Sequence, residues 1–444
     1  MITVRLSAAV GRLLAALALA LTAQGALAGP AIQHWIAETG ARVYFVPVDT
    51  LPMLDVRIDF DAGSARDPRG LEGLASMARG LLDAGTDGLD EQAIAEARAD
   101  TGAQFDGGTS EDRAWFSVRT LSSAAERDAA LSLAARLIAR PSYPQDVLAR
   151  EKARSIASLR ESLTRPATLA DRAFTRAVYG DHPYGALHEV NSIEAIDRDA
   201  LLDFHRRHYT ARNAAVTIVG DASREEAERI AVQLTRDLPA GEPLPPLPEP
   251  AMPQARHERI AHPSSQAHIL AGLPGMSRND PDYFALLVGN HILGGSGLVS
   301  RLNSEVRDAR GFAYSVYSYF APQAVAGPFQ IGLQTRGGQA EDALRVVREV
   351  LDAFIADGPT EAELEAAKAN LINGFGLRLD SSAKILGWVS VVGFYGLPLD
   401  WLDRYPGQVA AVTAEAVRDA FARRIKPEHM VVVVAGGDGD AVRP

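Results

Sequence analysis

The ten histidines are the first side chains to consider for chemistry. The 444-residue chain contains no cysteine, which excludes thiolate catalysis, disulfides and Cys-ligated zinc. His205 and His208 lie three apart, a spacing that places two ligands on one face of a helix. Arg206 and Arg207 stand between them, however, and such a run is more typical of a solvated basic face. His182 precedes a proline, where it is expected to cap or pack in a turn. The histidines alone therefore predict no metal centre.

A glycine-rich segment is the second candidate. Gly294, Gly295 and Gly297 indicate a flexible loop, but no Lys-Ser/Thr pair follows as in phosphate-binding loops. The pattern after it predicts a helix over 298–310, closed by Gly311. A strand over 312–320 is expected next, because apolar residues alternate there.

The elements that position these residues can be read from hydrophobic periodicity. Alternation over 56–60 and 114–118 predicts half-buried strands. Helical spacing recurs in several longer segments: 71–82, 124–138, 145–163, 283–293, 341–355 and 360–377. Strands and long helices are mixed in both halves, so the sequence predicts an α+β fold with mixed sheets and packed helices.

An internal repeat divides the chain into two lobes. The segment from Phe204 to Asp221 matches the segment from Phe421 to Asp438 without a gap, at an offset of 217 residues, and strand and helix patterns upstream repeat as well. Between the copies, residues 238–253 hold seven prolines in sixteen positions, which favours an extended spacer. We therefore expect homologous lobes at 29–237 and 257–444, joined by a Pro-rich linker at 238–256 like the halves of a clamshell.

The first 28 residues predict export to the periplasm. Arg5 and Arg12 precede a short apolar run, and Ala26-Leu27-Ala28 is typical of a signal-peptide cleavage site, predicted after Ala28. The run is shorter than the ~20 residues that span a bilayer, so no membrane anchor is expected. Loss of the two arginines would change the net charge from −11 by two units to −13, which disfavours nucleic acid as a partner.

Four stretches together give the chain a specific resemblance. They are Asp61-Ala62-Gly63-Ser64 with Asp67; Gly73-Leu74-Ala75 with Gly85-Thr86; His182-Pro183-Tyr184-Gly185; and Leu293-Gly294-Gly295 with Ser300-Arg301-Leu302, Arg307, Gly311 and Tyr314, and the match that they carry extends over nearly the whole mature chain. In these motifs the chain resembles the insulinase or pitrilysin-type zinc metallopeptidases, the group that includes mitochondrial processing peptidase. The resemblance implies two homologous lobes per chain and the pairing of two chains around zinc.

The positions that correspond to the family's zinc site are all replaced. Members bind zinc through two histidines four apart on a helix, with a general-base Glu between them, and through a Glu on a later helix. Here the corresponding residues are Ser76, Arg79, Gly80 and Ser158. None of these side chains can ligate zinc or act as the base, and an arginine would place a positive charge where the cation should lie. The resemblance therefore implies no cofactor in this chain.

The second lobe keeps two residues to which the resemblance assigns a role. In the family, an Arg and a Tyr spaced like Arg307 and Tyr314 hold the substrate backbone and the developing oxyanion when the lobes close over zinc. Both side chains are donors suited to negative charge. From the sequence alone, Arg307 could instead pair locally with Glu305 or Asp308, and Tyr314 could pack in its strand.

These observations favour a non-catalytic subunit, inactive alone, that joins a homologous zinc-bearing peptidase chain and admits peptides or unfolded polypeptides. The zinc is expected in the partner. One alternative is a peptide-binding or scaffold protein with no catalytic role. Another is a metal-dependent peptidase that uses different ligands.

Overall fold

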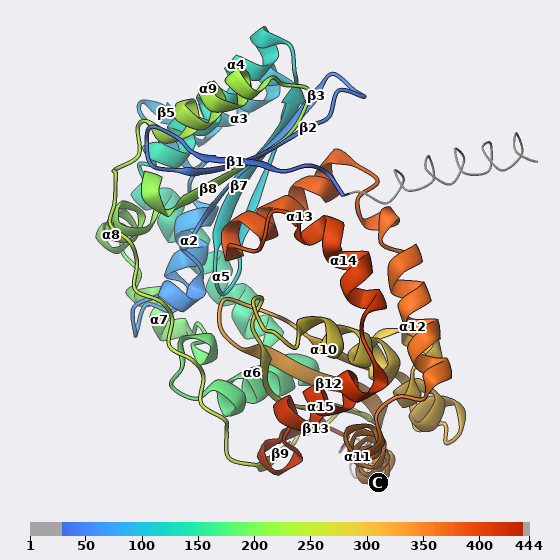
Figure 1. The fold of residues 1–444 in the computed structure, drawn as a ribbon. Helices are drawn as coiled ribbons and strands as arrows, with labels where there is room; N and C mark the ends of the chain where they lie inside the picture. The colour runs from blue at the N-terminus through green and yellow to red at the C-terminus, as the bar shows by residue number, and fades with distance from the viewer. Residues whose placement is uncertain (1–28, 438–444) are drawn as a thin grey trace, which may run out of the picture.

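The computed structural model describes residues 29–437, and the predicted signal peptide lies outside this range. The chain forms two β-sheets, one from each half, that face each other across the molecule (Figure 1). This arrangement confirms the predicted α+β class with two lobes of mixed sheet. Between residues 29 and 437, no helix combines the length and the apolar character needed to span a bilayer.

The N-terminal sheet has six strands in the order β1-β2-β8-β3-β7-β6. They are β1 (Gln33–Ile36), β2 (Arg42–Pro47), β3 (Met53–Phe60), β6 (Gln104–Thr109), β7 (Ala114–Leu121) and β8 (Ala214–Gly220). Only β2 and β8 pair in parallel. A separate small ladder joins β4 (Gly85–Thr86) to β5 (Leu89–Asp90). The alternation predicted around positions 58 and 116 lies in β3 and β7, which pair with each other.

The helices of the first half pack mainly on the outer face of this sheet. They are α2 (Leu74–Gly80), α3 (Glu91–Thr101), α4 (Ala124–Ala139), α5 (Gln145–Ser162), α7 (Val190–Ala195), α8 (Arg198–His208) and α9 (Arg224–Thr235). Local sequence fixes several of their starts. In α9, for example, Ser223 and Glu226 form a reciprocal capping box that satisfies two free backbone donors.

The C-terminal sheet has five strands in the order β11-β12-β10-β13-β9. They are β9 (Arg256–Ile260), β10 (Gln266–Met276), β11 (Ala313–Phe320), β12 (Gly327–Arg336) and β13 (Val431–Gly436), and only β9 and β13 are parallel. Its helices are α10 (Tyr283–Asn290), α11 (Ala340–Asp357), α12 (Glu361–Asn373), α14 (Trp401–Ala410) and α15 (Ala414–Arg424).

The internal repeat is visible in the structure, with a register one residue different from the gapless sequence match. Helix α8 corresponds to α15, and the short turns at 211–213 and 427–429 correspond as well, each at an offset of 216. Gly220 and Gly436, which end the two matching strands with positive φ, share this offset. The buried faces agree with it, because Leu201 and Val417 are both buried. The sequence match at 217 follows shared Phe and Arg residues instead.

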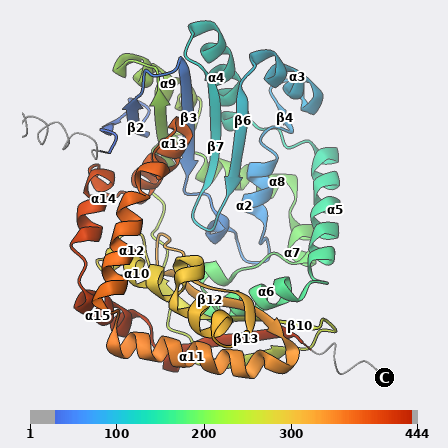
Figure 2. The ribbon, with the colours of Figure 1, turned by 90° about the vertical axis from the view of Figure 1, so that its right-hand side faces the viewer.

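Each half lends one helix to the other half's sheet. Helix α6 (Pro166–Tyr179) packs on the C-terminal sheet, where Phe174 and Val178 join Val433 in one apolar cluster. Helix α13 (Ser382–Tyr395) packs on the N-terminal sheet, and its Gly393 lies against the ring of Tyr44 so closely that a Cβ would be 2.6 Å from it. The two views agree on this exchange (Figures 1 and 2). The two halves therefore share their cores.

A buried aspartate adds a polar junction between the halves. Asp112, in the turn between β6 and β7, accepts hydrogen bonds from the hydroxyls of Tyr184 and Tyr395 and from the backbone of Ala324 (2.9 Å). Burial beside this carboxylate raises the pKa of both tyrosines above the usual value, so they remain donors. Tyr184 belongs to the His-Pro-Tyr-Gly motif, which therefore lies where the lobes meet.

The proline-rich segment runs along the outside of this junction. Residues 239–255 contain neither helix nor strand. His182 contacts the carbonyl of Pro248 through Nε2 (2.8 Å), and its Nδ1 accepts from the backbone of Tyr184 (3.1 Å). His182 thus caps and packs in a turn, as its place before proline predicts.

Candidate functional site

The candidate site of the first lobe is built on helix α2. Gly73 precedes the helix with φ of 104°, a conformation that favours glycine. Asp67 accepts hydrogen bonds from the backbone of Gly73 and Ala75, both at 2.7 Å, and so fixes the start of the helix. Burial raises the pKa of Asp67 to about 7, against these two donors, which favour the ionised form. The six- and eight-residue spacings from Asp67 to Gly73 and Ala75 therefore serve to place α2.

The face of α2 that carries ligands in zinc-bearing relatives is bare. Ser76 and Gly80 are both exposed and four residues apart, and Ser158 is exposed on α5. A Cβ at Gly80 would meet nothing within 4 Å. Among residues 29–437, no group of three or more His, Asp or Glu side chains is placed to hold a metal ion. A serine pair without imidazole or carboxylate partners does not fit zinc.

Arg79 does not occupy the place where a cation would lie, which corrects one expectation. Its side chain is buried and turned away from Ser76 and Gly80, under the sheet. The guanidinium donates to the carbonyls of Trp115 (2.5 Å) and Asp106 (3.1 Å) and lies over the ring of Phe116. Burial lowers the pKa of Arg79 from its usual value.

Arg79 therefore fastens α2 to β6 and β7. Gly107 makes room for it, since a Cβ there would fall 1.6 Å from the guanidinium. The family's general base is replaced here by a structural hydrogen-bond donor.

His205 and His208 do not lie on a solvated basic face, so that expectation was wrong. Both are buried, at 5% and 7% exposure, while Arg206 and Arg207 point to solvent. His205 contacts the carbonyl of Ile138 (2.8 Å) and His208 that of Asp61 (3.1 Å). Burial lowers the pKa of both imidazoles, which makes them neutral core histidines.

In the second lobe, the segment 298–310, expected to form one α-helix, is interrupted and partly adopts π-helical geometry. A 3₁₀ turn (Gly297–Val299) is followed by a π-helical segment (Asn303–Asp308), and another π-helical segment (His291–Gly295) continues α10. Together we call residues 291–308 the π segment. It packs along the outer side of β11, the first strand of the sheet.

Two asparagines that the sequence reasoning missed attach the π segment to β11. Asn303 donates to the carbonyl of Val316 (2.9 Å), and Asn290 donates to that of Ser318 (3.1 Å) and accepts from its hydroxyl (2.7 Å). Asn303 is nearly fully buried. The available signal was a polar residue inside a largely apolar run, as with Asn290 between Val288 and Ile292.

The three glycines of this segment have distinct steric reasons. A Cβ at Gly294 would lie 2.4 Å from the Ser318 hydroxyl, and one at Gly295 would lie 2.7 Å from the Asn290 amide. Gly297 has φ of +66°. Close approach to β11 at Gly294, close approach to Asn290 at Gly295 and a left-handed turn at Gly297 explain these residues, beyond the expected loop flexibility.

Arg307 and Tyr314 lie side by side at the end of the π segment. The Arg307 guanidinium is 5.7 Å from the centre of the Tyr314 ring, and Tyr314 is 90% exposed. Within residues 29–437, neither side chain has a hydrogen bond or ion pair. Glu305 pairs with Arg310 instead (2.5 Å), so the local Arg307 pair considered from the sequence is not formed. Tyr314 does not pack in the strand, while Tyr317 and Tyr319 stack on each other.

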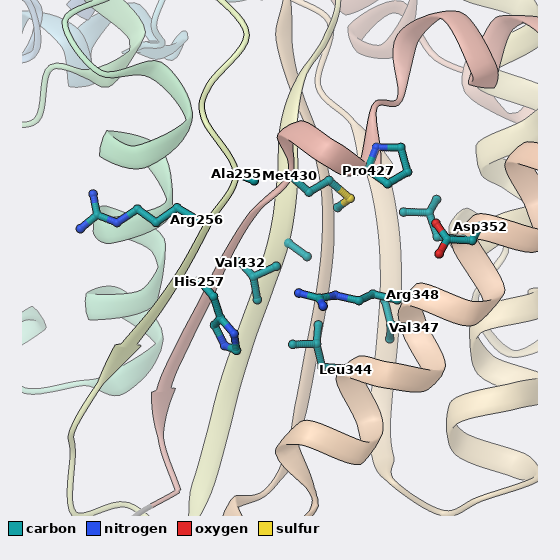
Figure 3. Close-up of a pocket in the computed structure, with 12 residues that line it drawn as sticks. Ala255, Arg256, His257, Leu344, Val347, Arg348, Asp352, Pro427, Met430 and Val432 are labelled. Carbon is teal, nitrogen blue, oxygen red and sulfur yellow. The ribbon is translucent and has the colours of Figure 1, made fainter.

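A separate cavity of about 410 Å³ lies on the outer side of the second lobe, between β9, β13 and α11 (Figure 3). Leu344, Val347 and Val432 form its apolar wall, and His257 and Arg348 lie beside it. In the first lobe α9 packs at the corresponding place, on α4 and β2. In the described part of the chain, no helix follows β13 to cover the cavity. Polar side chains of β9, His257 among them, border it. The cavity lies at the β9 end of the sheet, whereas Tyr314 lies on β11 at the opposite end.

Comparisons with known proteins agree with this geometry. The family model described as the peptidase M16 inactive domain matches residues 195–371. The crystal structure of a peptidase M16 inactive domain from Pseudomonas fluorescens is similar with a TM-score of 0.88 and 39% identity, covering 91% of this chain and 98% of that one. An uncharacterized zinc protease of Streptomyces coelicolor is 31% identical over 272 residues, and the match spans 59% of either chain. The periplasmic protease PqqL from Escherichia coli shares the fold, with a TM-score of 0.76 at 19% identity; the likeness covers 92% of this chain and 46% of that one.

The two-lobed fold and the bare face of α2 define a non-catalytic relative of zinc peptidases. The chain belongs to the peptidase M16 family, the insulinase-like metallopeptidases, among its inactive members.

Proposed function

We propose that this chain is the non-catalytic subunit of a heterodimeric periplasmic zinc metallopeptidase. A homologous partner would supply the zinc ion and its general base. This chain would supply Arg307, Tyr314 and half of the chamber around a peptide. The observation that carries the proposal is that the half-buried Arg307 and the exposed Tyr314 lie adjacent, without any other partner in the described range.

The chemistry of the pair suits a peptidase reaction. A carbonyl attacked by zinc-bound water becomes negatively charged, and a guanidinium and a phenol can donate to that oxygen. Donors held in place before the reaction contribute most, because they need not reorganise. The π segment and its asparagines hold Arg307. Tyr314 lies at an irregularity of β11, between Ala313 and Val316, and both of these residues pair with β12.

Peptide binding is expected to use the backbone of a sheet edge. At β11, the side chains of Asn290 and Asn303 already occupy the carbonyls of Ser318 and Val316. At β6, a terminal strand of the N-terminal sheet, the guanidinium groups of Arg79 and Arg98 engage the carbonyls of Asp106 and Phe105. Strand addition at either edge would therefore have to use backbone groups other than these carbonyls. The PqqL chain, of which this chain covers 46%, supports an arrangement in which two such two-lobed units act together.

The alternative is a peptide-binding or scaffold protein. A relative from Helicobacter pylori, 24% identical over 375 residues, is described as a non-peptidase homolog. A scaffold has no need of an oxyanion donor, so the adjacent Arg307 and Tyr314, which have no other partner in the described range, favour the peptidase subunit.

Reconstitution tests the proposal. The mature chain is purified with and without a homologue that carries the H-x-x-E-H motif, and cleavage of an unfolded polypeptide is followed with zinc content. We expect a stable complex with one zinc per heterodimer and activity only in the mixture. A homologue whose Glu in the motif is changed to Gln serves as control. Equal activity of the homologue without this chain would refute the proposal.

A further inference from the structure

A pocket with both polar and apolar walls lies on the inner face of the C-terminal sheet, beside the exchanged helix α6. Its volume is about 300 Å³. The wall combines a carboxylate, amides, an imidazole and a phenol: Asp171 from α6, His268 from β10, Ser315 and Tyr317 from β11, and Gln330 and Gln334 from β12. Ser315 directly follows Tyr314 in the chain. The pocket therefore adjoins the strand that carries the proposed oxyanion donor.

An aromatic ring is fixed within this wall. Tyr317 stands opposite Gly332 in the β11–β12 ladder, and its ring lies across that glycine. A Cβ at position 332 would come within 2.4 Å of the ring, so glycine is needed for the ring to lie flat. Tyr319 stacks on Tyr317 with ring centres 6.1 Å apart. Such a phenol face attracts cations.

The pocket has a negative charge without a partner. Asp171 is exposed in area, and no hydrogen bond or ion pair engages its side chain among the described residues. Burial by surrounding atoms nevertheless raises the pKa of Asp171, and the charge of the adjacent Arg172 opposes this increase. The adjacent Arg172 is already committed, because it donates to Glu189 (2.7 Å).

A second carboxylate approaches from the other lobe. Glu111, in the turn between β6 and β7, is exposed and lies near Tyr319. Burial, followed by the charges of Tyr317, Asp171 and Glu111, raises the pKa of Tyr319 to about 12. Burial lowers the pKa of His268, so this imidazole is neutral at pH 7 and brings no opposing charge.

We infer that this pocket is a subsite for an arginine or lysine side chain of the bound peptide. Asp171 would pair with the cationic head, and Tyr317 would stack on it. This inference rests on the proposed function insofar as it assumes a peptide ligand, and it assigns that peptide a basic residue. The partner subunit is not needed for the subsite, since all of its wall residues come from this chain.

Peptide binding to the mature chain alone tests the inference. The probe is a fluorescein-labelled peptide of about ten residues with a single arginine in an Ala/Ser background, and its control has citrulline, the neutral analogue, at that place. Fluorescence anisotropy measures both. We expect the arginine peptide to bind about tenfold more tightly, which is the range for one hydrogen-bonded charge pair.

Three variants make the result specific. Asp171→Asn and Tyr317→Leu should remove the preference for arginine, and Asp100→Asn, which removes an exposed carboxylate on the distant α3, should retain it. Circular dichroism checks folding. Equal affinity for both peptides, equal effects of Asp171→Asn and Asp100→Asn, or no binding up to about 1 mM would each overturn the inference.

The outcome is separable from that of the proposed function. If the unmodified chain shows no preference for the arginine peptide but the reconstituted peptidase is active, the subsite alone is rejected. A retained preference with no contribution to turnover would reject the subunit role alone.

Discussion

At the residue scale, Arg79 occupies the position that the family resemblance assigns to the general base, and here its side chain has a structural role. Its guanidinium joins α2 to carbonyls of β6 and β7, and Gly107 leaves space for it. In the second lobe Asn290, at the end of α10, makes a similar bond to the carbonyl of Ser318 on β11. Both lobes therefore attach the terminal strand of a sheet through a polar side chain from the preceding helix.

Replacing Arg79 should destabilise the fold in a charge-dependent way. Arg79→Gln loses the charge-assisted bonds and should cost about 1–3 kcal/mol. Arg79→Glu would bury a carboxylate against two carbonyl oxygens and should cost about 3–5 kcal/mol. Urea unfolding of both variants measures the difference. Equal stability of the Glu variant and the wild type would show that Arg79 does not attach α2 to β6 and β7.

The bare face of α2 leads to a prediction about zinc. The isolated mature chain should bind no stoichiometric zinc, because Ser76, Gly80 and Ser158 offer no suitable donors. A variant with His at 76 and 80 and Glu at 79 and 158 should bind zinc weakly at best, because ligands also need supporting hydrogen-bond partners. Calorimetric titration with zinc reports both. One tightly bound zinc in the unmodified chain would contradict the prediction.

At the element scale, the position of the π segment depends on its anchorage to α12. Arg301 donates to both carboxylate oxygens of Glu363 (2.7 Å each) and to the carbonyl of Gly358 (3.0 Å). Glu363 also completes the capping box of α12 with Thr360. The bond to Arg301, more than any other contact, lowers the pKa of Glu363 from 4.5 to about 2.

This shift gives the anchorage a defined pH dependence. Because the folded pKa lies below the unfolded one, the stabilisation is present above pH 4.5 and is lost as pH falls toward 2. Glu363→Gln keeps a capping side chain but not the charge. The stability difference between wild type and variant, measured in denaturant at pH 7, 4 and 3, should therefore shrink at the acidic end. A difference independent of pH would exclude the ion pair as its source.

The same segment shows what local sequence could not reveal. The pattern of positions 298–310 is helical, and Gly311 ends it with φ of +63° as expected. The widening to π geometry accompanies contacts of Asn290 and Asn303 with β11, a strand formed later in the chain. Likewise, the charges around His205 suggested a solvent face, whereas its burial depends on packing against α4.

At the scale of the whole molecule, the exchange of α6 and α13 makes the lobes interdependent. The repeat and the mixed α+β class were predictable, because strand alternation and matching motifs recur in both halves. The exchange was not, since the apolar face of α6 would suit either sheet. Only the long-range contacts of Phe174 with β13 and of Gly393 with Tyr44 specify the partners.

The exchange predicts that the linker is not what holds the halves together. A protease site inserted within residues 239–255, which contain no helix or strand, should be cleavable without separating the fragments. The cut protein should elute in gel filtration at the position of the intact chain, because each fragment keeps a helix buried on the other's sheet. Elution as two half-size species would contradict this account of the core.

The central claim, that this chain contributes to a partner's catalysis, is tested most directly through Arg307 and Tyr314. Both are outside the core, and Tyr314 is 90% exposed, so Arg307→Ala and Tyr314→Phe should leave the melting temperature and the heterodimer unchanged. The measurement is turnover of the reconstituted complex by each variant, beside its melting temperature. We predict a loss of about 10²–10³ in rate for each removed donor at unchanged stability. Unchanged turnover in both variants would contradict the claim and favour the scaffold instead.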